Sequence, residues 1–205
     1  TAPNLGLLDR FLLIMQRQKL DTVICFNKSD IAGSEHTEEL KNIYRSSGCS
    51  VLSTSVKTGL GIEMLREIME GKTSVMAGPS GVGKSSLTNA LFPDAQMATG
   101  EISRKVKRGR HTTRHSEIFA IGGSTYLIDT PGFSTLYIDD FDKDELKYYF
   151  PEFDKYINSC RYSGCNHISE PGCAVKAAVR DGTISSVRYE SYREMQGYLS
   201  GLKKY

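Results

Sequence analysis

No stretch of the 205-residue sequence stays apolar for the roughly 20 residues that a membrane-spanning helix requires. The sequence also lacks the charged-then-apolar N-terminal segment, followed by small residues, that marks a secretory signal. Internal repeats and low-complexity tracts are absent too, which excludes a repeat architecture. Since 39% of the residues are hydrophobic and 24% are charged, we expect a globular, cytoplasmic protein that contacts no membrane.

Net charge is almost absent, because 26 basic residues face 24 acidic ones, and the resulting +2 says little about partners. The distribution says more. Six cations crowd one acid-free stretch over 104–114: Arg104, Lys105, Lys107, Arg108, Arg110 and Arg114. Such a run alone is as compatible with a solvated loop as with a binding site. Its position beside a motif described below favours an anionic partner.

The five cysteines cannot all pair within the chain, because their number is odd. Cys25 and Cys49 fall in strand-like apolar segments and are most simply buried core residues. The other three lie between positions 160 and 173, beside a histidine. That clustering points to a metal site.

Hydrophobic periodicity predicts alternating strands and helices over most of the chain. We expect helices at about 5–18, 35–47, 62–69 and from 84, and strands at about 22–26, 50–53, 73–77, 117–121 and 125–129. This alternation is typical of an α/β fold with a mainly parallel sheet. Beyond about residue 140 the pattern changes to helices and a Cys-rich loop. We therefore expect a domain over 1–140 and a small helical domain over 141–205.

A phosphate-binding loop is predicted where G-x-x-x-x-G-K-[ST] follows a strand and precedes a helix. Its glycines let backbone N–H groups turn inward around a phosphate, and the helix N-terminus adds partial positive charge. Lys84 can reach the β- and γ-phosphates, and the Ser85 hydroxyl suits Mg²⁺. The predicted nucleotide-binding residues are Gly78, Pro79, Ser80, Gly81, Val82, Gly83, Lys84, Ser85 and Ser86. Kinases and ATPases share this loop, so it does not identify the base.

The base is indicated by N-K-x-D at Asn27-Lys28-Ser29-Asp30, which follows an apolar segment. The Asp30 carboxylate can accept both N1–H and the N2 amine of guanine, whereas adenine would leave that carboxylate unpaired. The Lys28 stem can lie along the base, and Asn27 can hold the loop. Alone, these four residues would equally suit an ordinary turn.

A second guanine-type loop is formed by Ser55, Val56 and Lys57, which resemble the S-A-K loop of GTPases. In that loop a backbone N–H reads the guanine O6 atom. Because valine replaces only the alanine side chain, the backbone donor survives here.

Two further segments carry nucleotide chemistry. Asp129-Thr-Pro-Gly132 is a D-x-x-G, in which Asp129 would hold Mg²⁺ through water and the Gly132 N–H would sense the γ-phosphate. Upstream, Thr113 is the preferred threonine to close on Mg²⁺ in the triphosphate state, with Thr112 the next choice. Together these motifs predict bound GTP or GDP and Mg²⁺.

The order of these motifs is permuted, since N-K-x-D and S-V-K precede the phosphate loop. On NKSD, GPSGVGKSS, TGEIS, GRHTTRH and DTPGF, the sequence resembles a circularly permuted GTPase of the bacterial ribosome small-subunit-dependent GTPase A family, over nearly its whole length. The resemblance implies GTP hydrolysis stimulated by the small ribosomal subunit during late maturation, with that subunit and its ribosomal RNA as partners. Family members also carry an N-terminal OB-fold domain, which this sequence does not include.

The metal segment is C-x4-C-x-H-x5-C, formed by Cys160, Cys165, His167 and Cys173. Three thiolates and one imidazole make a closed tetrahedral zinc site of structural type. The spacing differs from the common C-x2-C finger, so unrelated buried thiols remain an alternative on chemistry alone. The family resemblance implies one structural Zn²⁺ in this C-terminal domain.

The catalytic group is less evident than the binding residues. Many GTPases carry a water-orienting glutamine directly after D-x-x-G, where this sequence has Phe133, which cannot hydrogen-bond. This predicts slow hydrolysis by the isolated protein, or a catalytic group from elsewhere. His111 is the candidate water-positioning residue, with Thr113 beside it, although His111 could equally contact phosphate or be merely exposed.

Three functional hypotheses remain at this point. The first is a monomeric GTP-hydrolysing ribosome assembly factor. The second is a guanine-nucleotide-dependent RNA-binding switch with negligible turnover, which Phe133 favours. The third is a P-loop kinase. Two features count against it: the N-K-x-D motif and the lack of an obvious acceptor-substrate site.

Overall fold

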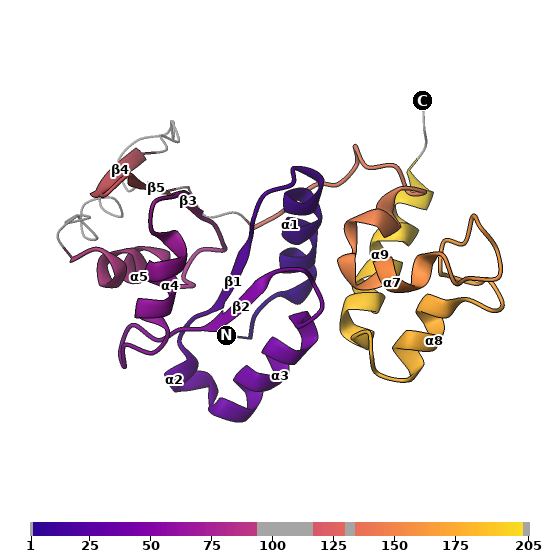
Figure 1. The fold of residues 1–205 in the computed structure, drawn as a ribbon, viewed down its shortest axis with the longest axis horizontal. Helices are drawn as coiled ribbons and strands as arrows, with labels where there is room; N and C mark the ends of the chain where they lie inside the picture. The colour runs from indigo at the N-terminus through magenta and orange to yellow at the C-terminus, as the bar shows by residue number, and fades with distance from the viewer. Residues whose placement is uncertain (1, 94–116, 130–133, 203–205) are drawn as a thin grey trace. The chain divides into compact units, whose positions relative to one another are not determined.

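The computed structural model describes residues 2–93, 117–129 and 134–202, which form short strands and helices in alternation (Figure 1). The first part contains α1 (Leu5–Arg17), β1 (Val23–Phe26), α2 (Ser29–Ala32), α3 (Ser34–Tyr44), β2 (Ser50–Ser53), α4 (Ile62–Met69), β3 (Thr73–Met76) and α5 (Lys84–Leu91). The second contains β4 (Glu117–Gly122) and β5 (Thr125–Asp129). The last contains the 3-10 helices η2 (Leu146–Tyr149) and η3 (Pro151–Phe153), then α7 (Asp154–Ile157), α8 (Ala174–Arg180) and α9 (Ser186–Gly201).

The long helices begin at residues whose side chains cap them. The Asn4 side chain accepts a hydrogen bond from the Leu7 N–H at 3.0 Å, which satisfies an N-terminal donor of α1. Helix α9 begins in the same way, since Ser185 Oγ accepts from the Arg188 N–H at 3.5 Å. These caps and the apolar periodicity explain why both helices form where they do.

The strands form two small sheets. β1 pairs with β2, and a three-stranded sheet has the order β3-β5-β4. In that sheet β3 runs parallel to β5, whereas β4 and β5 form an antiparallel hairpin. The predicted α/β class is confirmed, and the three-stranded sheet holds one parallel and one antiparallel pairing.

The chain folds into two compact units whose segments alternate along the sequence. One comprises Thr1–Ile24, Glu38–Val51 and Thr135–Tyr205, and the other comprises Cys25–Thr37 and Leu52–Ser134. We call the first the helical unit, because it contains α1, most of α3 and the C-terminal helices. The second contains the predicted nucleotide motifs, and we call it the nucleotide unit. Within the described residues, no helix is both long and apolar enough to cross a membrane.

An aromatic and aliphatic core holds the helical unit together. Tyr192 of α9 meets the rings of Phe150 and Phe153 edge-on, with centroids 5.2 and 5.0 Å apart. Leu13 of α1 packs into the same buried cluster, which is why α1 belongs to this unit. Such edge-to-face contacts add to the stabilisation that burial of the rings provides.

Candidate functional site

The phosphate loop lies where the sequence predicts it, between the end of β3 and the start of α5. Gly83 directly precedes α5 with φ of 96°, a left-handed conformation that residues with a Cβ rarely adopt. A Cβ at this position would also lie only 2.6 Å from Asn27 Nδ2. Glycine is therefore required at position 83 for two separate reasons.

Lys84 folds back over its own loop. Its ammonium group donates to the carbonyl oxygens of Gly78 at 2.7 Å and Pro79 at 3.1 Å. The next residues, Ser85 and Ser86, are exposed at the beginning of α5. The loop thus presents a cation and two hydroxyl groups around one helix N-terminus, an arrangement suited to an anion.

The N-K-S-D segment contacts this phosphate loop directly. Asn27 Nδ2 donates to the Val82 carbonyl at 3.0 Å, and Lys28 Nζ donates to the Gly81 carbonyl at 2.8 Å. These partners are 55 and 53 positions apart in the sequence. The structure therefore brings together the two motifs that are predicted to bind one nucleotide.

The predicted base-reading carboxylate is held by the S-V-K loop. Buried Ser55 donates from Oγ to Asp30 Oδ1 at 2.6 Å. The Ser55 Oγ atom also accepts a hydrogen bond from the Thr58 N–H at 3.3 Å. Val56 and Lys57 are exposed beside it. A hydrogen bond to one carboxylate oxygen orients the other for a ligand, which is what recognition of a base edge needs.

Thr54 is a site residue that motif reasoning missed. It is fully buried, and its hydroxyl donates to Asn27 Oδ1 at 3.3 Å. Its carbonyl accepts from both the N–H and the hydroxyl of Ser29, at 3.1 and 3.0 Å. Thr54 therefore orients the amide that contacts the phosphate loop. The only signal in the sequence was a threonine directly before S-V-K.

Among the remaining predicted residues, only Asp129 has a described backbone position. It ends β5 opposite Met76, the last residue of β3, so its backbone lies at the sheet edge where the phosphate loop begins. The other predictions lie outside the described residues: His111, Thr112, Thr113, Gly132, Phe133 and the basic stretch 104–114.

The predicted metal ligands gather in one cluster of the helical unit. Cys160, Cys165, His167 and Cys173 place one ligand atom each within 4.8 Å of all the others. Cys160 Sγ lies 3.9 Å from Cys173 Sγ, and His167 Nδ1 lies 3.6 and 3.4 Å from these two sulfur atoms. The imidazole thus faces the thiols through Nδ1.

These distances fit a tetrahedral zinc ion. Zinc bound to sulfur at about 2.3 Å and to nitrogen at about 2.0 Å separates sulfur ligands by about 3.8 Å, and sulfur from nitrogen by about 3.5 Å. The separations among Cys160, His167 and Cys173 match these values, and the Cys165 sulfur lies within 4.8 Å of the other ligand atoms. With four protein ligands the site is closed, as structural zinc sites are.

Burial governs the ionisation of this cluster. It raises the pKa of the Cys165 thiol to about 12 and lowers the pKa of His167 to about 4. Burial also raises the pKa of Cys173. The imidazole is thus held neutral, as a metal ligand must be. A divalent cation would reverse the effect on the thiols, since a coordinating thiol is deprotonated.

The loop that carries the ligands is fixed by charged side chains. Buried Lys147 donates to the Cys165 carbonyl at 3.0 Å. The Glu170 carboxylate accepts from the N–H groups of Asn166 at 2.7 Å and Ile168 at 2.9 Å. Against the effect of burial, these backbone bonds lower the pKa of Glu170.

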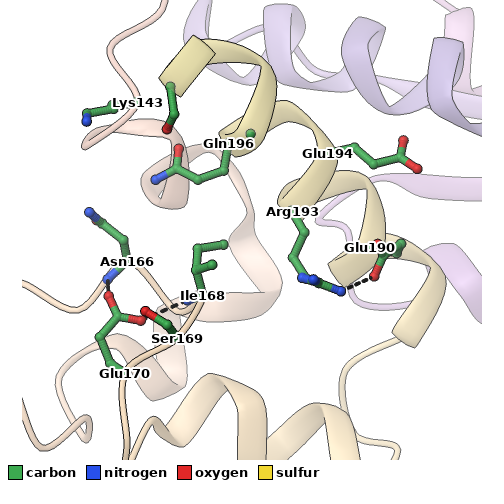
Figure 2. Close-up of a pocket in the computed structure, with 11 residues that line it drawn as sticks. Lys143, Asn166, Ile168, Ser169, Glu170, Glu190, Arg193, Glu194 and Gln196 are labelled. Atoms are coloured by element: carbon green, nitrogen blue, oxygen red, sulfur yellow. Dashed lines mark hydrogen bonds and ion pairs between the residues drawn. The ribbon is translucent and has the colours of Figure 1, made fainter.

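A cleft of about 500 Å³ also lies in the C-terminal part of the chain (Figure 2). Its walls carry charges of both signs, including Lys143, Glu170, Glu190 and Arg193, and Arg193 pairs with Glu190 at 2.8 Å. None of the residues predicted to bind nucleotide lines it. Since its walls carry three carboxylates, with Glu194 as the third, against two cations, and no phosphate loop borders it, the cleft does not suit a nucleotide.

Comparison with known proteins agrees with the permuted motif order. A family model described as RsgA GTPase matches residues 1–139. Two proteins called "Small ribosomal subunit biogenesis GTPase RsgA" are similar over 203 residues. The protein from Agathobacter rectalis is 50% identical over 99% of this chain and 67% of its own length, and that from Alkaliphilus metalliredigens is 43% identical over 99% and 70%. The chain thus spans about two thirds of these relatives.

Solved structures give the same result for the fold. The crystal structure of YjeQ from Thermotoga maritima matches with a TM-score of 0.81 and 39% identity, over 98% of this chain and 68% of that one. YloQ, described as a circularly permuted GTPase, matches with a TM-score of 0.75 and 34% identity, over 100% of this chain and 66% of that one.

Proposed function

Because this chain belongs to the RsgA GTPase family, we propose that it binds GTP, hydrolyses it to GDP and phosphate, and acts in the biogenesis of the small ribosomal subunit. One observation carries the nucleotide part. Asn27 and Lys28 of the base-reading segment donate directly to the Val82 and Gly81 carbonyls of the phosphate loop. Base and phosphates can therefore be held by one continuous surface.

Each predicted residue has a definite task in this proposal. Backbone N–H groups of Gly78–Ser85, apart from Pro79, which has none, would bind the phosphates together with the Lys84 ammonium, and the Ser85 hydroxyl would be a ligand of Mg²⁺. Asp30, oriented by Ser55, accepts the two guanine donors, and Val56 supplies the backbone N–H for guanine O6. When bound, Mg²⁺ would supply neutralisation of the charge that develops on the phosphates.

The hydrolytic step uses residues outside the described ranges. We assign Thr113 to Mg²⁺ together with Ser85, Asp129 to its water shell, and Gly132 to the γ-phosphate. His111 is the proposed water-positioning residue. The basic stretch 104–114 would contact ribosomal RNA, so that RNA binding orders the switch and completes the catalytic site.

The C-terminal region supplies structure rather than chemistry. Cys160, Cys165, His167 and Cys173 would hold one structural Zn²⁺, which would add folding energy to that of the buried core around Phe150, Phe153 and Tyr192. The end of the matched family region at residue 139 supports a division into a GTPase domain over 1–140 and a zinc-binding domain over 141–205. We further propose a monomer that acts in the cytoplasm, where its proposed ribosomal partner is assembled.

The test is phosphate release from GTP by the protein, with and without small ribosomal subunits. We expect stimulation of at least about tenfold by the subunits. No release under either condition, despite tight GTP binding, would instead support the second candidate, an RNA-binding switch with negligible turnover. That candidate is favoured by Phe133, which cannot orient water.

Base specificity is tested separately from turnover. Asp30→Asn replaces one of the acceptors that guanine needs, so it should lower the preference for GTP over ATP by at least about tenfold. Competition of unlabelled GTP and ATP against a fluorescent nucleotide measures this preference. Equal binding of the two by the unmutated protein would contradict the guanine assignment and revive the kinase hypothesis.

A further inference from the structure

Helix α9 carries two neighbouring rows of polar side chains that contact different parts of the helical unit. Tyr189 and Tyr192 donate from their hydroxyls to the carbonyls of His167 at 2.6 Å and Asn166 at 2.7 Å. Arg188 and Ser191 both contact the Asp9 carboxylate of α1. Within each row the residues are three positions apart, so both rows run along the same helix.

The row that contacts α1 is a buried ionic cluster. Arg188 Nη1 lies 2.6 Å from Asp9 Oδ1, and Arg188 Nε lies 2.7 Å from Glu152 Oε1 of η3. The three side chains are 3%, 0% and 1% exposed. Burial alone would lower the pKa of Arg188, but the two carboxylates raise that pKa above its usual value. Because a buried charge without its partner is costly, α1, η3 and α9 are held in one arrangement.

The row that contacts the metal loop acts on a ligand residue. His167 has φ of 59°, an unfavourable conformation for a residue with a side chain, so its backbone must be held by its surroundings. The Tyr189 hydroxyl holds the His167 carbonyl, and Phe153 packs edge-on against the His167 ring, with centroids 5.7 Å apart. Fully buried Tyr192 fixes the preceding carbonyl.

We propose that α9 couples the metal cluster to helix α1. Tyr189 and Tyr192 are positioning residues for the ligand His167, and Asp9 fixes α9 where these tyrosines reach the loop. The coupling rests on the proposed zinc site. It is reciprocal, so metal binding stabilises α1, the helix that leads into β1 and the N-K-S-D segment. Asp9 thus contributes to metal affinity without touching the metal.

Zinc affinity, measured by competition with a chromophoric chelator, tests this coupling in the 205-residue chain. Tyr192→Phe should lower affinity by about tenfold, as loss of an outer-shell contact does. Asp9→Asn should lower it by about fivefold. Arg193→Ala, on the exposed side of α9, is the matched control and should change nothing. The Co²⁺-substituted protein should show an altered absorption spectrum in Tyr192→Phe but not in the control.

The double variant separates coupling from general destabilisation. If Asp9 acts through α9, Asp9→Asn should have a smaller effect in the Tyr192→Phe background than alone, whereas fully multiplicative effects would overturn the coupling. Ser191→Ala removes one hydrogen bond to Asp9 and should lower zinc affinity about twofold, so it serves if Asp9→Asn does not fold. Hydrogen exchange should show that chelation lowers protection of α1 amides but not of α5 amides.

The outcomes distinguish this inference from the metal assignment. Wild-type chain that binds no zinc overturns both. Wild-type chain that binds zinc while Asp9→Asn and Ser191→Ala bind it equally well overturns the coupling alone. Unchanged protection of α1 on chelation does the same.

Discussion

The nucleotide loops and the metal cluster solve opposite problems with similar polar groups. In the nucleotide unit, Lys28, Asp30 and Ser85 are exposed, and Asn27 and Lys28 contact the phosphate loop through its backbone carbonyls. In the helical unit, His167, Cys165 and Cys173 are buried, with 0%, 3% and 5% exposure. Exposed groups suit a ligand that enters and leaves, and enclosed groups suit an ion that stays.

This difference predicts how each region fails. Removing a side chain from the open loops should reduce binding or turnover with little loss of stability. Removing one from the enclosed region should reduce stability first, because a buried polar group left behind has no water to replace its partner.

The largest expected effect is on stability, from Arg188→Ala. This change leaves the carboxylates of Asp9 and Glu152 buried without their cation, so the free energy of unfolding should fall by about 3–5 kcal/mol. Urea denaturation followed by circular dichroism measures it. Glu63→Ala, which removes an exposed ion pair but leaves the Arg66 hydrogen bonds to the Leu91 and Ala90 carbonyls, is the control and should cost less than about 1 kcal/mol. Equal effects of the two changes would remove the contrast between the regions.

The next effect is on catalysis, from Lys84→Ala. Loss of the ammonium that faces the phosphates should lower the rate of GTP hydrolysis by about 100- to 1000-fold, as loss of a preorganised charge donor does. The urea midpoint should stay close to that of the wild type, since the Lys84 ammonium donates to carbonyls of its own loop. Lys41→Ala, at a surface ion pair, is the activity control. A variant that hydrolyses GTP normally would contradict the assignment of the loop.

The smallest effect is expected from Thr54→Val, which keeps the shape of the side chain and removes its hydroxyl. Asn27 then loses the donor to its Oδ1, and nucleotide affinity should fall by about fivefold, the equivalent of one hydrogen bond. Fluorescent GDP titration measures this change. Thr58→Val, in the neighbouring exposed loop, is the control. Unchanged affinity with a lower melting temperature would show that Thr54 serves stability alone.

Local sequence patterns predicted most of the helices and strands. They could not predict which distant residues contact one another. The bounds of β2 and α4 agree with the prediction at both ends, because apolar periodicity and flanking glycines are properties of the segment itself. Helix α2 was not predicted, since its four residues fall inside the N-K-S-D motif and carry too little periodicity.

The clustering of Cys160, Cys165, His167 and Cys173 was predicted from spacing, and the structure confirms that they meet. The ionic cluster was not, because Asp9 and Arg188 are 179 positions apart and neither belongs to a motif. A charged residue is expected at the surface unless its partner is known. The proposed roles of His111, Thr113 and Gly132 stay predictions.

Because residue 83 is a glycine, the phosphate loop and the N-K-S-D segment can pack directly against each other. A methyl group at position 83 would clash with the side-chain amide of Asn27. Even alanine in the phosphate loop would therefore displace that amide, which belongs to the segment that selects the base. These loops lie more than 50 positions apart along the chain, yet neither is free to vary alone. A change at position 83 that weakens phosphate binding should therefore also lower the selectivity for guanine over adenine.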